Sequence, residues 1–340
     1  MEKPIYTDSI FYNRELVKRF ISDLNLPIPV ISMDTFYYHL VLYEYDYESL
    51  TRYNELINLI KAQFDGDVEK FLKEYYDTRD NIINAVLENE AYQKFNTADI
   101  SKYTNKNRQF PKSSIYNNEN QNKVFISIDL KKANFQTLKH YDSNIVFNAN
   151  TYEDFIGKFT DLDYIKESKY TRQVVFGKLN PKRHISMEKY YISLIYDFLK
   201  ISFPFFNNFC TCVSVTNDEI IFRVDDDSEV AIGCISDMIN DGRIAEIVST
   251  LGFDVHVSLF RLFGYNLISE ARNKIVTTFF NKEYLDKLDH PFRLKCVPLP
   301  YHSLIYKLYK GFRLSDLDYH FAYEGIESKF CDTFHIEPFK

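Results

Sequence analysis

The chain has 340 residues, of which 45% are hydrophobic and 17% aromatic, and its formal net charge is −7. This length is sufficient to bury one large core or two ordinary ones. No run approaches the roughly 18 apolar residues of a membrane-spanning helix, and the N-terminus lacks the apolar core of a signal peptide. We therefore expect no membrane partner and a cytoplasmic protein, in the host cytoplasm if it is viral.

Residues 1–100 predict an N-terminal helical domain. Apolar side chains recur there at helical spacing, as in Leu16, Phe20 and Leu24. Residues 101–122 are polar and rich in Asn, which predicts a loop or linker.

From residue 123 onward the pattern mixes strands and helices. A short apolar strand at 124–128 ends at Asp129, and a helix follows at 133–138. Residues 143–205 are mainly helical, and a hairpin of 212–215 and 219–224 follows, with a polar turn at 216–218. A helix at 243–251, strands at 255–262 and 295–297, and a helix at 300–310 complete the chain. The fold class is therefore α+β.

Carboxylates stand at two of these strand ends. Asp129 ends an apolar strand, and Asp218 lies in the turn of an apolar hairpin. Nucleotidyl transfer needs divalent cations about 4 Å apart, held by carboxylates on rigid elements. The spacing predicts that Asp129 and Asp218 bind Mg²⁺ or Mn²⁺ if the two strands are neighbours.

Basic residues lie between the two carboxylates. Residues 166–189 carry 7 Lys and Arg against 2 acidic residues, although residues 1–100 carry 10 basic against 18 acidic residues. Phosphates are held by such side chains. The candidates for nucleotide binding are Arg172, Lys178, Lys182 and Arg183.

Three segments carry a resemblance to a known family. Asp129-Leu-Lys-Lys-Ala-Asn-Phe135, preceded by Phe125-Ile-Ser-Ile, resembles motif A of palm-domain polymerases. Val215-Thr-Asn-Asp-Glu-Ile-Ile-Phe222 resembles motif C of family A DNA polymerases. Arg172-Gln-Val-Val-Phe-Gly177, followed by Lys178, resembles the fingers helix of that family.

The resemblance implies a polymerase-like palm within 123–340, an antiparallel sheet with helices and a fingers insertion at 143–205. The helical block 1–100 would be thumb-like, and the partners would be a nucleic acid template–primer and nucleoside triphosphates. It also implies roles for single residues. Asp129, Asp218 and Glu219 would be catalytic, Arg172 and Lys178 would hold the triphosphate, and Asn134 or Phe135 would lie near the sugar.

Two departures from the family leave alternatives open. Asn217 stands where motif C usually has His, and the spacing of 89 residues from Asp129 to Asp218 is short for family A. The first alternative is a catalytically inactive palm-derived protein of a phage or virus that binds nucleic acid or serves assembly. The second is an unrelated α+β protein whose aspartates are turn residues.

Overall fold

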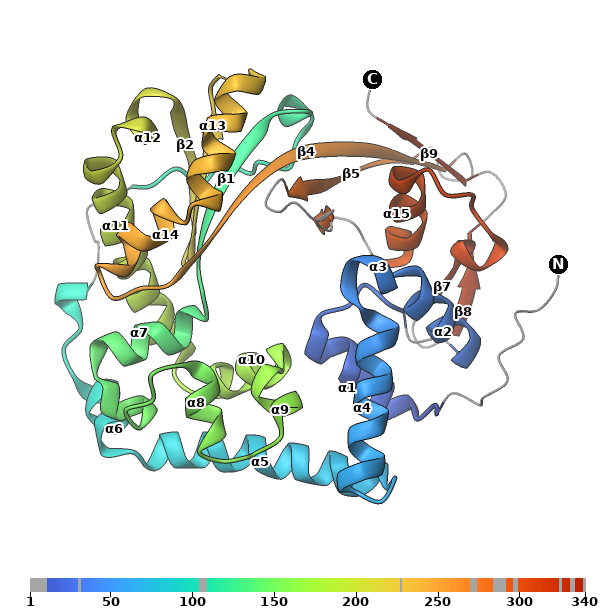
Figure 1. Ribbon diagram of the computed structural model, residues 1–340, viewed down its shortest axis with the longest axis horizontal. Helices are drawn as coiled ribbons and strands as arrows, with labels where there is room; N and C mark the ends of the chain where they lie inside the picture. Colours follow the sequence, from blue (N-terminus) through green and yellow to red (C-terminus); the bar gives the residue numbers. More distant parts are fainter. Residues whose placement is uncertain are drawn as a thin grey trace. The chain divides into compact units, whose positions relative to one another are not determined.

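The protein combines helices with an antiparallel sheet, in agreement with the α+β prediction (Figure 1). The computed structural model describes residues 11–29, 32–103, 109–226, 228–269, 274–283, 292–295, 299–323, 326–330 and 334–338. The chain forms two compact units. The first contains residues 1–81, 160–174 and 299–330, and the second contains 82–159, 175–298 and 331–340.

The first unit is mainly helical. Its elements are α1 (Arg14–Leu24), α2 (Met33–Leu42), α3 (Glu44–Tyr47), α4 (Ser49–Gln63), most of α5 (Val68–Glu88), α9 (Asp163–Glu167), the start of α10 (Lys169–Lys178), α15 (His302–Lys310), and the strand pair β7 (His320–Tyr323) and β8 (Ile326–Lys329). Helix α1 begins where the Asn13 side chain accepts hydrogen bonds from two backbone N–H groups, and it ends at Asn25 in the left-handed region. Its buried face consists mainly of Leu16, Val17 and Phe20.

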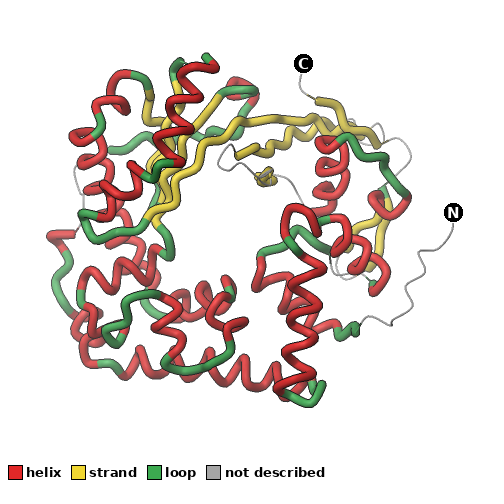
Figure 2. Tube along the Cα trace, viewed as in Figure 1, coloured by secondary structure: helices red, strands yellow, loops and turns green. Residues whose placement is uncertain are grey.

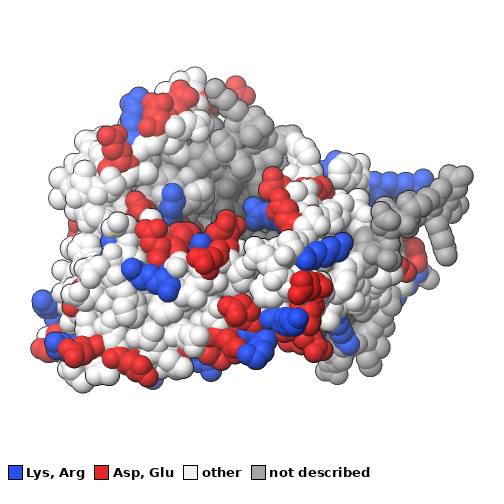
Figure 3. Space-filling model, turned by 60° about the horizontal axis from the view of Figure 1, so that its bottom comes forward, with Lys and Arg blue, Asp and Glu red and all other residues white. Residues whose placement is uncertain are grey.

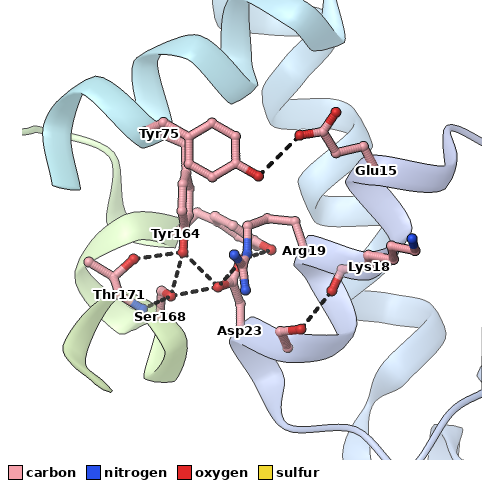
Figure 4. Close-up of polar contacts among 10 residues, drawn as sticks. Glu15, Lys18, Arg19, Asp23, Tyr75, Tyr164, Ser168 and Thr171 are labelled. Atoms are coloured by element: carbon pink, nitrogen blue, oxygen red, sulfur yellow. Dashed lines mark hydrogen bonds and ion pairs between the residues drawn. The ribbon is translucent and has the colours of Figure 1, made fainter. Parts of the chain in front are cut away.

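A buried carboxylate connects distant segments of this unit (Figure 4). Asp23 is 2% exposed and pairs with the Arg19 guanidinium at 3.1 Å. One oxygen accepts hydrogen bonds from the Tyr75 hydroxyl and the Ser168 hydroxyl, each at 2.7 Å. The other oxygen accepts one from the Tyr164 hydroxyl at 2.9 Å. Asp23 therefore anchors residues 160–174 to the N-terminal helices of the same unit.

We predict that Asp23→Ala lowers the free energy of unfolding by about 3–5 kcal/mol, because it leaves the buried Arg19 charge unpaired. Urea denaturation followed by circular dichroism measures this change. Asp77→Ala is the matched control, since Asp77 also pairs with a residue four positions away but is 56% exposed. Its effect should stay below about 1 kcal/mol. Equal losses in the two variants would contradict the anchoring role of Asp23.

The second unit contains a seven-stranded antiparallel sheet in the order β2-β3-β1-β4-β5-β6, with β9 also paired to β4 (Figure 2). Its first four strands follow the chain order β-α-β-β-α-β, a split β-α-β arrangement. The strands are β1 (Val124–Leu130), β2 (Cys210–Val215), β3 (Glu219–Val224), β4 (Val255–Ser269), β5 (Lys274–Glu283), β6 (Phe292–Lys295) and β9 (Phe334–Pro338). The helices are α6 (Glu90–Thr97), α7 (Ala133–Tyr141), α8 (Tyr152–Gly157), α11 (Pro181–Ser202), α12 (Pro204–Asn208), α13 (Glu229–Asn240) and α14 (Arg243–Ser249), with the ends of α5 and α10.

The two faces of β1 differ in what covers them. Ile126 lies opposite Phe222, whose ring contacts the rings of Phe206 in α12 and Tyr196 in α11 at 4.5 and 6.1 Å. Because side chains alternate along a strand, Phe125, Ser127 and Asp129 lie on the other face. Ile115, from the stretch at 109–122, packs on Phe125 there.

Most predicted elements are confirmed, with small shifts at their ends. The strand that carries Asp129 extends to Leu130, the predicted hairpin is β2–β3, and the C-terminal helix begins at His302 and ends before Gly311, which has a φ of 72°. Helix α13 and strands β5, β7, β8 and β9 were not predicted. The predicted strand at 295–297 overlaps β6 only at Lys295, and its last two residues lie outside the described ones.

The compact units have boundaries other than the predicted ranges 1–100, 101–122 and 123–340. Residues 109–122 belong to the second unit and are tied to its sheet, since the Ser113 N–H donates to the Val213 carbonyl at 3.1 Å. Residues 104–108 of the predicted linker lie outside the described residues. The assignment of these ranges to a thumb-like, a linker and a catalytic domain stays a prediction.

Because two histidines are buried, we predict that the protein loses stability in acid. His39 is 1% exposed and His184 is 0% exposed, and burial lowers the pKa of each to about 4 from the ordinary 6.5. The unfolded chain therefore takes up a proton at each site near pH 6.5, whereas the folded chain resists protonation until about pH 4. Each site should reduce the free energy of unfolding by about 3 kcal/mol as the pH falls through this window. Unfolding curves of His184→Gln should show a smaller pH dependence than the wild type, and parallel curves would contradict this.

Candidate functional site

The sheet register brings the predicted carboxylates to one end of neighbouring strands. Asp129 in β1 lies directly opposite Glu219 in β3 and, on its other side, opposite His256 in β4. Residues opposite each other in an antiparallel pair have Cα atoms about 4.5–5.5 Å apart and point to the same face. Asp129, Glu219 and His256 therefore form a row of half-buried side chains across three strands.

The hairpin turn holds Asp218 beside this row. The Thr216 N–H donates to the Glu219 carbonyl at 2.9 Å, and the Glu219 N–H donates back to the Thr216 hydroxyl at 3.2 Å. The Leu130 N–H, one residue beyond Asp129, donates to the Asp218 carbonyl at 2.8 Å. The backbone at the tip of the hairpin therefore lies against the end of β1, with Asp218 next to Leu130 and Glu219 opposite Asp129.

Small polar residues orient the Glu219 carboxylate. The Ser127 hydroxyl donates to Glu219 Oε1 at 2.6 Å. Ser127 and its neighbour in register, Ser258, are 5% and 4% exposed. Ser127 thus holds the Glu219 side chain over β1, on the face that carries Asp129.

Gln136 joins the loop that follows β1 to the loop that precedes β4. Its side-chain amide donates to the Asp254 carbonyl at 2.8 Å and to the Lys131 carbonyl, and its oxygen accepts from the Asp254 N–H at 2.6 Å. The segment that leaves β1 after Asp129 is therefore tied to the segment that enters β4 before His256. Lys132, in the left-handed region with a φ of 51°, makes the sharp turn between β1 and α7.

A buried acidic residue of the same unit, Glu188 of α11, was not predicted from the sequence. It is 5% exposed, and its Oε1 has no hydrogen-bond partner in the part of the chain that the structure describes. Burial, together with the negative charge of Asp218, raises the pKa of Glu188 to about 7. A signal was present in the sequence, because Glu188 interrupts the apolar stripe that Met187, Tyr191 and Ile192 continue.

The predicted nucleotide-binding residues lie on several helices. Lys178 and Lys182 are exposed at the end of α10 and the start of α11, and Asn134 is half-buried in α7. Phe135 is 3% exposed and packs on Tyr152, with ring centroids 6.1 Å apart.

Two of the predicted basic residues have other surroundings. The Arg183 guanidinium donates to the Ala98 carbonyl and lies over the Phe95 ring at 5.1 Å, which gives it a packing role in the second unit. Arg172 belongs to the first compact unit, whereas the carboxylates belong to the second.

The carboxylates suit a hard divalent cation by their chemistry. Mg²⁺ prefers carboxylate oxygens, and it is usually bound by one or two carboxylates together with waters and substrate phosphates. Among the described residues, no three His, Cys, Asp or Glu side chains converge into a complete metal cage. Asp129 and Asp218 could thus hold Mg²⁺ or Mn²⁺ in a site completed by substrate.

The face drawn in Figure 3 shows no bias toward one kind of charge. On the face drawn in Figure 3, Asp and Glu are interspersed with Lys and Arg, and the residues described there form no continuous basic tract. Within the described part of the chain, no helix is both long and apolar enough to cross a membrane.

Comparison with protein-family models, with curated proteins and with solved structures finds no match to this chain.

Proposed function

We propose that the protein is a template-directed nucleotidyltransferase, similar to a DNA polymerase, with a two-metal carboxylate site. One observation carries the proposal: Asp129 and the Asp218–Glu219 pair lie at the ends of neighbouring strands, in a sheet whose first four strands follow the chain order β-α-β-β-α-β. This layout supports a polymerase-like palm, in which residues 143–205 are the fingers insertion and the N-terminal helices are thumb-like. The substrates are then a nucleic acid template–primer and nucleoside triphosphates.

In this proposal the site residues have different roles. Asp129 and Asp218 would hold Mg²⁺ or Mn²⁺, which would activate the attacking hydroxyl and stabilise the leaving pyrophosphate. Glu219, oriented by Ser127, directs its carboxylate toward the primer end. Lys178 and Lys182 are exposed and available for the triphosphate.

A second candidate is the inactive palm-derived protein that binds nucleic acid or serves assembly. The observation that favours it is the engagement of Arg183 with the Ala98 carbonyl and of Phe135 with the core, since both side chains are then unavailable to a nucleotide. The same experiment separates the two candidates.

The test is extension of a primed template by the purified chain with Mg²⁺ or Mn²⁺. We expect incorporation by the wild type and a loss of at least about 100-fold in rate for Asp129→Asn and for Asp218→Asn, because a metal-held charge is worth several kcal/mol in the transition state. Both variants are isosteric, so the sheet should remain folded, and circular dichroism checks this.

The control is Glu246→Gln, which changes an exposed carboxylate on α14 and should leave the rate unchanged. Activity retained in the double variant of Asp129 and Asp218 would remove the site assignment. A folded wild type without any incorporation on DNA or RNA templates would favour the inactive, palm-derived protein.

A further inference from the structure

Lys131 stands two residues beyond Asp129, at the point where the chain leaves β1. The Lys131 N–H donates to the Asp254 carbonyl at 3.0 Å, which continues the pairing of β1 with β4 by one step past Leu130 and Val255. Residues two apart along a strand share a face, and their Cα atoms are about 7 Å apart. The pairing therefore places Lys131 next to Asp129 on the same face of the sheet.

The backbone of Lys131 is held by a buried side chain as well as by the strand pairing. Its carbonyl accepts a hydrogen bond from the side-chain amide of Gln136, which is 8% exposed. The same amide donates to the Asp254 carbonyl at 2.8 Å, and the Gln136 oxygen accepts from the Asp254 N–H at 2.6 Å. Because this backbone is already ordered, Lys131 loses little conformational freedom there when it binds a ligand.

Lys131 and its neighbour Lys132 differ in the surroundings of their side chains. The Lys132 ammonium pairs with Glu153 and lies 5.5 Å from the centre of the Tyr152 ring. Lys131 is exposed, and its ammonium makes no ion pair or hydrogen bond with the residues that the structure describes. Lys132 is therefore engaged within the protein, whereas the charge of Lys131 is available to a ligand.

The proposed function needs a cation that holds phosphates close to the carboxylates. Of the basic residues predicted for this role, Arg183 donates to the Ala98 carbonyl, and Arg172 belongs to the first compact unit. Lys131 instead follows Asp129 in the same chain segment and the same compact unit. A lysine ammonium is a compact charge with three donors, and it binds phosphate oxygens well.

We propose that Lys131 binds the phosphates of the incoming nucleoside triphosphate. This inference rests on the proposed function, to which it adds a phosphate-binding residue on the face that carries Asp129. Gln136 is then a positioning residue, because it holds the carbonyl of Lys131 and the backbone of Asp254.

The experiment measures the affinity of the full chain for ATP that carries a fluorescent N-methylanthraniloyl group on its ribose, in the presence of Mg²⁺. We expect Lys131→Met to weaken this binding at least about tenfold, because a charge-assisted contact to phosphate is lost. Lys131→Arg keeps the positive charge and should retain most of the affinity. Lys158→Met, which changes an exposed lysine of the same unit, is the matched control and should bind like the wild type. Circular dichroism checks that each variant is folded.

Two further measurements distinguish the triphosphate from the phosphates of a nucleic acid. In primer extension, Lys131→Met should raise the KM for the triphosphate more than it lowers kcat. Its affinity for a labelled primer–template duplex, measured by fluorescence anisotropy, should stay close to that of the wild type. A loss of duplex binding without a loss of ATP binding would overturn the assignment of Lys131 to the triphosphate.

The outcomes separate this inference from the proposed function. If the wild type binds no labelled ATP, or if Lys131→Met binds it like the wild type, the role of Lys131 is overturned, and primer extension by the wild type would still support the proposed function. Equal losses in Lys131→Arg and Lys131→Met, or in Lys158→Met and Lys131→Met, also overturn it. If Lys131→Met alone weakens ATP binding but the wild type extends no primer, the phosphate site stands and the polymerase proposal fails.

Discussion

The register of β1 between β3 and β4 is the constraint on which the rest of the second unit depends. A shift of one residue would move Asp129 to the helix-covered face and an isoleucine to the face on which Ile115 packs. The apolar side chains Ile126 and Ile128 prevent that shift, because both are 0% exposed. The burial of these two isoleucines thus determines which face of the sheet carries Asp129 and Glu219.

Hydrogen bonds at the strand ends convert this register into a local arrangement of side chains. The backbone bond from Leu130 to Asp218 closes the space between β1 and the hairpin, and Ser127 orients Glu219. Gln136 joins the loop before β4 to the loop after β1 by hydrogen bonds. The groups that make these contacts are uncharged. They therefore position the acidic side chains without neutralising their negative charge.

The buried carboxylates of this protein differ in the number of hydrogen-bond donors around them. This difference separates structural from functional roles. Asp23 and Asp318 are each surrounded by donors, some of them from segments distant in the sequence, and these contacts stabilise the first unit. Glu188 is buried instead with no hydrogen-bond partner for its Oε1 among the described residues, and burial, together with the charge of Asp218, raises its pKa to about 7. An arrangement that opposes stability in this way is typical of a site for a ligand.

The sequence by itself determined the secondary structure around the candidate site. Alternating and helical spacings predicted β1, the β2–β3 hairpin and the helices of residues 14–97, because these patterns depend on local geometry alone. The long strand β4 and the C-terminal strands were missed in whole or in part, since their pairing depends on partners distant in the chain.

Tertiary structure alone decided which residues meet at the site. The pairing of Asp129 with Glu219 and with His256 joins residues from three separate strands that no sequence spacing relates. It also placed Arg183 against the Ala98 carbonyl, where the sequence had suggested a phosphate. The physical reason is that a spacing along the chain specifies the face of a helix or strand, whereas the packing of elements specifies what that face touches.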